Sequence, residues 1–305
     1  MTPGTGRLDV RWLELALDYH CNLRCLGCMA CHGGDEALDG TAIRALLEGG
    51  RRRNIPNLWI GGGEPTLRTD LLRVIATAKR LGFARILLQT NGMRLAYGPY
   101  VDALAAAGVT EVSLNVKSHR AELHDALSRR EGTHALLIAA LRELSRTSLG
   151  RFADVLVTKS TAPDLPDTVR VFAGHGVSRF TLWLLSAADV DDASVQSEIP
   201  KISELHPHLR AAAAAADAAG VELVTLHTPP CTLPEDLRGG WQSVRDLRLE
   251  VVDPSGHAFP LEASPFEGSR YAPCESCAVH ARCAGPRVDY MRIHGNSEFV
   301  PLTNG

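Results

Sequence analysis

Residues 13–28 read LELALDYHCNLRCLGC, an apolar segment that runs directly into three cysteines. The segment Leu13–Tyr19 has the apolar character of a β-strand, so Cys21, Cys25 and Cys28 are expected on the loop that follows it. The spacing of the three thiols is C-x3-C-x2-C. The sequence therefore predicts that three thiols are gathered on one short loop at the end of one strand.

Outward from this loop, short apolar segments alternate with amphipathic ones as far as residue 226. The expected strands are Leu13–Tyr19, Asn57–Gly61, Arg85–Gln89, Val112–Val116, Val155–Thr158, Phe180–Leu185 and Val221–Leu226. The expected helices are Thr41–Arg52, a segment that begins after Asp70 and ends at Leu81, Tyr100–Ala107, Thr133–Leu144, Leu165–Ala173 and an alanine-rich segment that ends at Ala219. Repeated β-α units imply parallel strands joined by right-handed crossovers. We therefore expect an α/β fold, a partial (β/α)6 TIM-like barrel with its active site at the C-terminal ends of the strands.

The alternation changes after about residue 228. A hairpin is expected there, with strands at residues 247–252 and 257–261 joined by a turn that contains Gly256. A second group of cysteines follows the hairpin. We therefore predict two domains, a barrel at residues 1–227 and a small domain at residues 228–305.

The chain has 305 residues, of which 45% are hydrophobic, and a net charge of −3 at pH 7. This composition is globular, and the charge gives no attraction to nucleic acid or to an anionic membrane. Residues 1–9 lack the pattern of a signal peptide, and no apolar run reaches the ~18 residues of a membrane span. We therefore expect a cytoplasmic protein with no nucleic-acid or membrane partner. In that reducing compartment grouped thiols indicate soft-metal ligation rather than disulfides.

The spacing of the first three cysteines favours an iron–sulfur cluster over zinc. A structural zinc site usually has four ligands, often from paired C-x2-C motifs. Three thiols on one loop suit a cluster that keeps one iron open. A zinc site completed by Cys31 or His32, or unrelated free thiols, remains the alternative.

A second motif makes the chain resemble the radical S-adenosylmethionine (radical SAM) family. The sequence Gly62-Gly63-Glu64-Pro65 ends the second expected strand, in register with the cysteine loop one strand earlier. The resemblance implies that Cys21, Cys25 and Cys28 bind a [4Fe–4S] cluster and that SAM occupies its fourth iron. It also implies SAM contacts from the backbone and carboxylate of this motif. The further contacts that it implies lie on later strands, at Asn91, Ser113 and Asn115.

The resemblance implies a reaction class as well. Reductive cleavage of SAM gives a 5′-deoxyadenosyl radical, which abstracts hydrogen from an unactivated C–H bond. The reducing electron is expected from a protein such as flavodoxin or ferredoxin. The cofactor supplies the difficult chemistry, and the protein supplies orientation and the exclusion of water.

The C-terminal cysteines are similar to the auxiliary-cluster extensions of this family, called SPASM or, when shortened, twitch. The thiols in question are those of Cys231, Cys274, Cys277 and Cys283. The hairpin of the SPASM pattern is present, but Leu261 stands at its cysteine position. Four thiols suffice for one further [4Fe–4S] cluster, which is the twitch-like interpretation. Zinc is the alternative for the last three cysteines.

Two cysteines are also candidates for catalysis by hydrogen-atom donation. Cys231 would be free to act in this way if it were not a cluster ligand, and Cys31 belongs to neither set of expected ligands. Because four thiols satisfy one cluster, the sequence favours oxidation of the substrate over epimerisation.

Three classes of function fit these motifs. The first is oxidation or epimerisation of a carbinol carbon in a small natural product, such as a sugar, aminocyclitol or nucleoside. The second is maturation of a ribosomally synthesised peptide, as an epimerase or cross-linking enzyme. The third, an iron–sulfur binding protein without radical chemistry, would not need the Gly-Gly-Glu motif. Only about ten residues precede the first strand, whereas peptide maturases often carry a recognition module there. We therefore expect a small-molecule substrate.

Overall fold

The computed structural model describes residues 10–28, 30, 33–187, 192–263 and 271–303. Cys31 lies outside these residues. Within them, nine strands form one sheet in the order β7-β6-β5-β4-β3-β2-β1-β8-β9. The strands are β1 (Trp12–Ala16), β2 (Asn57–Gly61), β3 (Arg85–Thr90), β4 (Glu111–Val116), β5 (Gly150–Val157), β6 (Arg179–Leu184), β7 (Glu222–Leu226), β8 (Leu249–Val252) and β9 (Ala258–Pro260).

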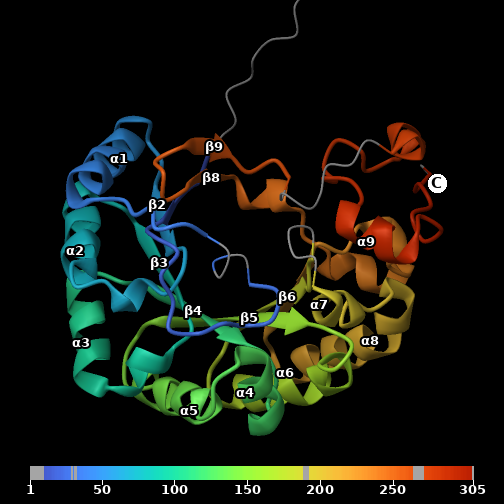
Figure 1. Cartoon of the computed structure of the whole chain (residues 1–305), viewed down its shortest axis with the longest axis horizontal. Helices are drawn as coiled ribbons and strands as arrows, with labels where there is room; N and C mark the ends of the chain where they lie inside the picture. Colours follow the sequence, from blue (N-terminus) through green and yellow to red (C-terminus); the bar gives the residue numbers. More distant parts are fainter. Residues whose placement is uncertain (1–9, 29, 31–32, 188–191, 264–270, 304–305) are drawn as a thin grey trace, which may run out of the picture.

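The helices of the described part are α1 (Gly40–Arg52), α2 (Leu71–Leu81), α3 (Gly98–Ala107), α4 (Ala121–Ser128), α5 (Thr133–Leu144), α6 (Leu165–Gly174), α7 (Ala193–Ser197), α8 (Ile202–Ala219) and α9 (Val288–His294). Of these, α1, α2, α3, α5, α6 and α8 lie on the outer, convex face of the curved sheet (Figure 1). Strands β1 to β8 pair in parallel, and only the pairing of β8 with β9 is antiparallel. The sheet is not closed, because β7 and β9 are its two edges. The predicted partial barrel is therefore confirmed.

The two faces of each strand explain this arrangement. In β1, Leu13 and Leu15 are fully buried in the main hydrophobic core, which also contains Ile43 and Leu47 of α1. Successive side chains of a strand point to opposite faces, so Glu14 points to the concave interior of the barrel. The helices thus pack against the apolar outer face of the sheet, and polar side chains lie on its inner face.

The expected elements are present, with several differences. Strand β5 begins at Gly150, five residues before its expected start, and helices α4, α7 and α9 were not expected. The hairpin β8–β9 is confirmed, but β8 also pairs with β1 in the sheet of the barrel. Residues beyond 228 thus extend the barrel itself, and the division into two domains stays a prediction. No helix in the described part has the length and hydropathy needed to cross a lipid bilayer.

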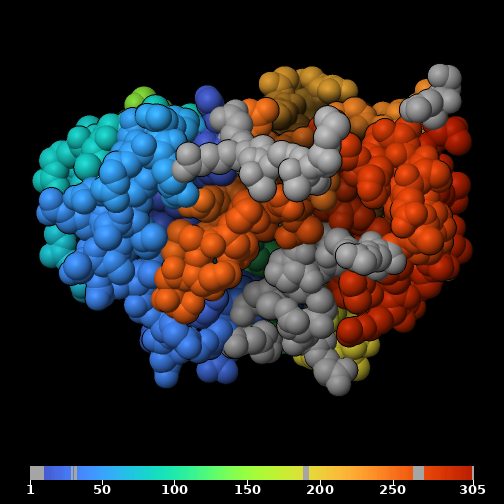
Figure 2. Space-filling model, turned by 90° about the horizontal axis from the view of Figure 1, so that it is seen from above, coloured from blue at the N-terminus to red at the C-terminus, as the bar shows by residue number. Residues whose placement is uncertain are grey.

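A buried ion pair fastens the C-terminal region to the end of β6. Arg287 and Asp289 are 1% and 2% exposed and bind each other. The Arg287 guanidinium also donates to the carbonyl oxygens of Leu184 and Leu185, at 3.2 and 2.7 Å. The Asp289 carboxylate accepts from the backbone amide of Ala187 at 3.0 Å. In Figure 2 the C-terminal residues (red) and the N-terminal barrel residues (blue) lie at opposite ends, with the hairpin residues (orange) between them.

Candidate active site

The first three cysteines lie on the loop after β1, as predicted. Cys21, Cys25 and Cys28 are free thiols and partly exposed. Burial and, to a smaller extent, the charges of Glu64 and of the two other thiols raise the pKa of the Cys21 thiol to about 11, although the amide of Leu23 lowers it. That amide lies 3.4 Å from the Cys21 sulfur. The three thiols and Glu64 thus lie close enough for their charges to interact.

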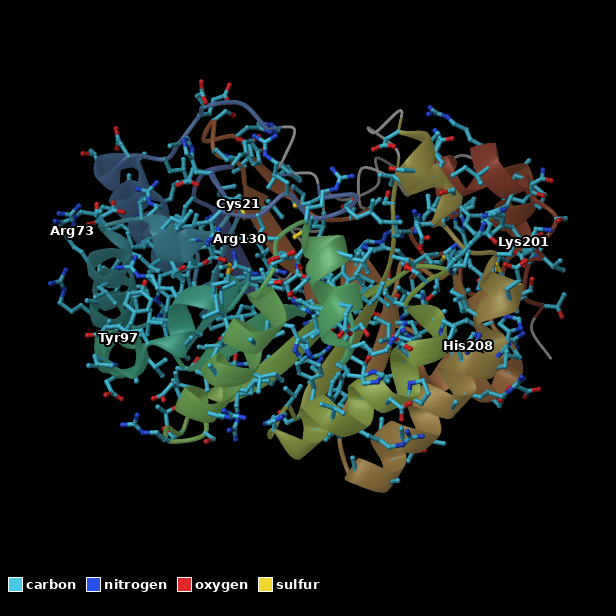
Figure 3. The ribbon with its side chains drawn as sticks, turned by 60° about the horizontal axis from the view of Figure 1, so that its bottom comes forward. Cys21, Arg73, Tyr97, Arg130, Lys201 and His208 are labelled. Atoms are coloured by element: carbon cyan, nitrogen blue, oxygen red, sulfur yellow. The ribbon has the colours of Figure 1, made fainter. Side chains whose placement is uncertain are left out.

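The cysteine loop is held from its far side by the end of α4. The Leu26 amide donates to the carbonyl oxygen of Leu127 at 2.9 Å. The Arg130 side chain donates to the carbonyl oxygen of Asn22 at 3.0 Å. Figure 3 shows Cys21 and Arg130 close to each other near the middle of the molecule. The loop is therefore positioned by strand β1 on one side and by the segment that joins α4 to α5 on the other.

The glycines of the Gly-Gly-Glu motif allow β2 to approach the cysteine loop. A Cβ at Gly62 would lie 2.5 Å from the carbonyl oxygen of Asp18, and one at Gly63 would lie 2.2 Å from that of His20. Real Cβ atoms do not come so close to backbone, and Gly62 also has a φ of +108°. The Gly63 amide donates to the carbonyl oxygen of Asp18 and the Glu64 amide donates to that of His20, each at 2.7 Å. The motif thus fixes the backbone just before Cys21.

The Glu64 carboxylate is 1% exposed and organises the ends of β2 and β3. Its Oε1 atom accepts from the Thr66 amide at 3.0 Å, the Thr66 hydroxyl at 2.6 Å and the Thr90 hydroxyl at 2.7 Å. Its Oε2 atom accepts from the Asn91 amide at 2.7 Å. The Asn91 side chain in turn donates to Asn22 Oδ1 on the cysteine loop at 2.7 Å. Four protein donors therefore use most of the hydrogen-bonding capacity of Glu64 and leave one lone pair on Oε2.

The two β4 residues predicted to contact SAM lie on one face of that strand. Ser113 is buried and donates to Asp154 Oδ2 at 2.8 Å. Asn115 is exposed at the strand end and accepts from the side chain of Lys117. Their role as SAM contacts stays a prediction.

The C-terminal thiols converge, although they come from distant parts of the chain. Cys231, Cys274, Cys277 and Cys283 line one narrow, mostly apolar cavity. Burial and the charges of the other three thiols raise the pKa of Cys231 to about 12. The side chains thus form one group of four.

Backbone amides and apolar rings complete this second site. The amides of Leu302 and Gly285 lie 3.4 Å from the sulfurs of Cys277 and Cys283. Phe299 and several prolines line the same cavity. In the described part of the chain, no three His, Cys, Asp or Glu side chains form a site for a single metal ion. The assignment of these cysteines, and of the first three, as metal ligands stays a prediction that rests on their convergence.

Sequence reasoning named Ser113 but missed the other polar residues of the barrel interior. Asp154 accepts hydrogen bonds from the side chains of Gln89, Ser113 and Trp183 on three other strands. Burial raises the pKa of Asp154, and these hydrogen bonds oppose the rise. The available signal was a charged residue inside an otherwise apolar strand, and Glu14 in β1 shows the same signal.

Comparisons with known proteins agree with this geometry. Residues 19–157 match the model of the radical SAM superfamily. Mycofactocin maturase MftC of Mycolicibacterium smegmatis is 30% identical over 175 residues, which are 54% of this chain and 42% of the relative. GTP 3′,8-cyclase of Synechococcus elongatus is 29% identical over 192 residues, 60% of this chain and 57% of the relative. The match thus spans about half the length of these curated relatives.

The fold is similar to solved structures over nearly the whole chain. Streptococcus suis SuiB bound to S-adenosylmethionine has a TM-score of 0.72 at 14% identity, covering 96% of this chain and 76% of SuiB. The structure of anSMEcpe with bound AdoMet and a peptide has a TM-score of 0.68 at 14% identity, and the match covers 95% of this chain and 92% of anSMEcpe. The predicted resemblance is confirmed for residues 19–157, and the predicted fold is confirmed by these structures. Residues 19–157 are thus a radical SAM domain.

Proposed function

We propose that this radical SAM enzyme modifies a peptide, as the maturase of a ribosomally synthesised precursor. The observation that carries the proposal is the similarity to SuiB over 96% of the chain, including the residues beyond 228. SuiB has also been solved bound to its precursor peptide SuiA, with a TM-score of 0.71. The curated relatives include a maturase. These findings favour a peptide over the small molecule expected from the sequence.

The residues present fit the two cofactors. We assign Cys21, Cys25 and Cys28 to the [4Fe–4S] cluster of the active site, because three free thiols share one loop there. When bound, SAM and this cluster supply the radical that removes a hydrogen atom from a C–H bond of the substrate. Gly62 and Gly63 hold the loop against β2, and Glu64 fixes the ends of β2 and β3 beside it. One lone pair of Glu64 Oε2 is left for the SAM ammonium group.

The four C-terminal thiols are assigned to a second [4Fe–4S] cluster. Cys231 belongs to this set, because its thiol is coupled by charge to those of Cys274, Cys277 and Cys283. Apolar side chains, among them Phe299 and several prolines, line the site. Cys231 is therefore proposed as a ligand and not as a hydrogen donor, which leaves Cys31 as the candidate donor.

A small-molecule substrate is the second candidate function. The similarity to GTP 3′,8-cyclase, whose name specifies a nucleotide substrate, favours it. In this case the enzyme would oxidise or epimerise a carbinol carbon. Oxidation would deliver an electron to the second cluster, whereas epimerisation would need a thiol donor.

The test compares the two substrate classes directly. The full chain is reconstituted anaerobically with iron and sulfide, then incubated with SAM, a reductant such as flavodoxin, and peptides encoded by short reading frames beside its gene. We expect 5′-deoxyadenosine together with a mass change or deuterium exchange in one peptide. The triple variant Cys21→Ala, Cys25→Ala, Cys28→Ala is the control and should yield neither. If only a small-molecule fraction of the producing cells gives coupled turnover while every peptide stays unchanged, the peptide proposal is wrong.

A further inference from the structure

The carboxylate of Glu14 lies inside the barrel without a hydrogen-bond partner in the described part of the chain. Its neighbours Leu13 and Leu15 are fully buried on the outer face of β1. Glu14 points the other way, toward the interior, where it is partly exposed. A carboxylate at such a position loses hydration without gaining a protein donor, which is unfavourable for stability. A position of this kind calls for a functional explanation.

Three polar atoms meet beside Gly61 at the end of β2. A Cβ at Gly61 would lie 3.4 Å from Glu14 Oε1, 3.3 Å from Gln89 Oε1 and 3.6 Å from Trp59 Nε1. Trp59 Nε1 is buried and has no hydrogen-bond partner among the described residues. The Gln89 side chain donates its NH₂ group to Asp154 at 2.9 Å, and its oxygen faces Gly61. Two hydrogen-bond acceptors and one donor thus surround the space that a side chain at position 61 would occupy.

Asp154 on β5 fixes the position of the Gln89 side chain by a hydrogen bond. Its Oδ2 atom accepts from Gln89 and Ser113 at 2.9 and 2.8 Å, and its Oδ1 atom accepts from Trp183 Nε1 at 3.1 Å. The donors come from β3, β4 and β6, and Asp154 itself lies on β5. Because its oxygens are occupied, Glu14 is the carboxylate that remains available to a ligand. A cavity of about 190 Å³ is lined by Trp59 and Asp154, among other side chains.

The charges around Glu14 favour a cation. Burial and the negative charge of Asp154 raise the pKa of Glu14 to about 7. The positive charge of Arg179 on β6 lowers the pKa of Asp154. The Arg179 side chain also donates a hydrogen bond to Gln242 Oε1 at 2.9 Å. Two neighbouring carboxylates therefore share one interior, and a bound cation would relieve both the repulsion and the lost hydration.

We propose that Glu14, Gln89 and Trp59 form a substrate subsite that binds a positively charged nitrogen group, a guanidinium or ammonium. Two facing acceptors require a ligand with at least two N–H donors, which these groups have and a hydroxyl lacks. Trp59 Nε1 offers a donor to a carbonyl oxygen next to the cation. Gly61 directly precedes Gly62, so the subsite adjoins the Gly-Gly-Glu motif. That the cation belongs to a Lys or Arg side chain of a peptide rests on the proposed function.

The test is a binding titration of the reconstituted full chain with methylguanidinium chloride, followed by tryptophan fluorescence and calorimetry. Glu14→Gln should weaken methylguanidinium binding about ten- to a hundred-fold, the effect of losing a charge-assisted hydrogen bond. Glu250→Gln is the matched control, because Glu250 lies on β8 and binds Arg53 at the surface. It should leave the affinity unchanged. Neutral methylurea and tetramethylammonium, which has no N–H donor, should bind at least tenfold more weakly than methylguanidinium.

A second variant removes the space and keeps the carboxylate. Gly61→Ala would place a methyl group at 3.3 to 3.6 Å from the three polar atoms, a tight but tolerable contact. It should reduce methylguanidinium binding about tenfold or more while the iron content stays that of the parent protein. Equal affinity in Glu14→Gln and the parent, or equal affinity for tetramethylammonium and methylguanidinium, would overturn the proposal.

The same experiment separates this inference from the proposed function. Methylguanidinium binding that depends on Glu14, found together with no peptide modification, would leave the subsite standing and contradict the peptide substrate. If the peptide is modified with the same KM in Glu14→Gln as in the parent protein, and methylguanidinium does not bind, the peptide substrate stands and the subsite is contradicted.

Discussion

Replacing Glu64 by glutamine is expected to weaken both the fold and SAM binding, because one carboxylate serves four protein donors. Its Oε1 atom accepts three hydrogen bonds and its Oε2 atom accepts one, and the side chain is 1% exposed. A glutamine that keeps the three bonds at Oε1 turns its NH₂ group toward the Asn91 amide, so two donors face each other. One unpaired buried donor costs about 1–3 kcal/mol, and loss of charge from the other bonds adds about 1 kcal/mol. The predicted loss is therefore about 2–4 kcal/mol in the free energy of unfolding.

The assay is anaerobic urea unfolding of the reconstituted protein, with SAM affinity measured by calorimetry on the same samples. The control is Glu48→Gln, since Glu48 forms an exposed i,i+4 pair with Arg44 on α1, and it should change the stability by less than about 0.5 kcal/mol. We expect SAM affinity to fall about tenfold or more in Glu64→Gln with iron content retained. A variant that lost SAM affinity at unchanged stability would refute the reasoning, because Glu64 would then act on SAM and not on the strand ends.

Three further predictions follow from the same structure. Cys231→Ala should lower the iron content below that of the parent by disrupting the second cluster; full iron content by colorimetric assay would instead make Cys231 a free thiol. Asp289→Asn should cost about 3–5 kcal/mol in urea unfolding, because it leaves Arg287 buried without its counter-charge, whereas Asp236→Asn in an exposed pair should cost less than about 1 kcal/mol. The pKa of Glu14 is raised from 4.5 to about 7 in the folded protein, so the folded state binds more protons in this range. Stability should fall by up to about 3 kcal/mol as the pH rises from 4.5 to 7, and Glu14→Gln should abolish this slope in unfolding curves.

The regular elements could be predicted because their apolar periodicity is local. In α2, Leu71, Ile75 and Ala78 lie on one face and are buried, as the pattern indicates. Strand β5 was placed too late, because its first residues, Gly150 and Arg151, carry no apolar signal. Helix α4 was missed for a similar reason, since its eight residues include three charged or ionisable ones and its N-cap makes no side-chain hydrogen bond.

The site was predictable only where its residues are close in sequence. The cysteine spacing and the Gly-Gly-Glu motif are local patterns, and both lie where they were expected. The hydrogen bonds of Asp154 join four different strands, so they depend on which strands pair and in which register. The role of Glu64 had the same limit: its sequence position predicted a carboxylate near SAM, but not that Thr66, Thr90 and Asn91 would already bind it.

The pairing of β1 with β8 sets the order in which the protein can fold. Trp12 lies opposite Leu249, so β1 acquires its second neighbour only after most of the chain has been synthesised. Until then β1 has an unpaired edge, and its cysteines lie beside an exposed row of backbone donors and acceptors that other chains can pair with. Such long-range pairing is slow, because the ends of a long loop must meet before any contact is gained. A chain truncated before β8 is therefore expected to aggregate through β1. The strand that carries the first cysteine loop is protected from such pairing only after β8 has paired with β1.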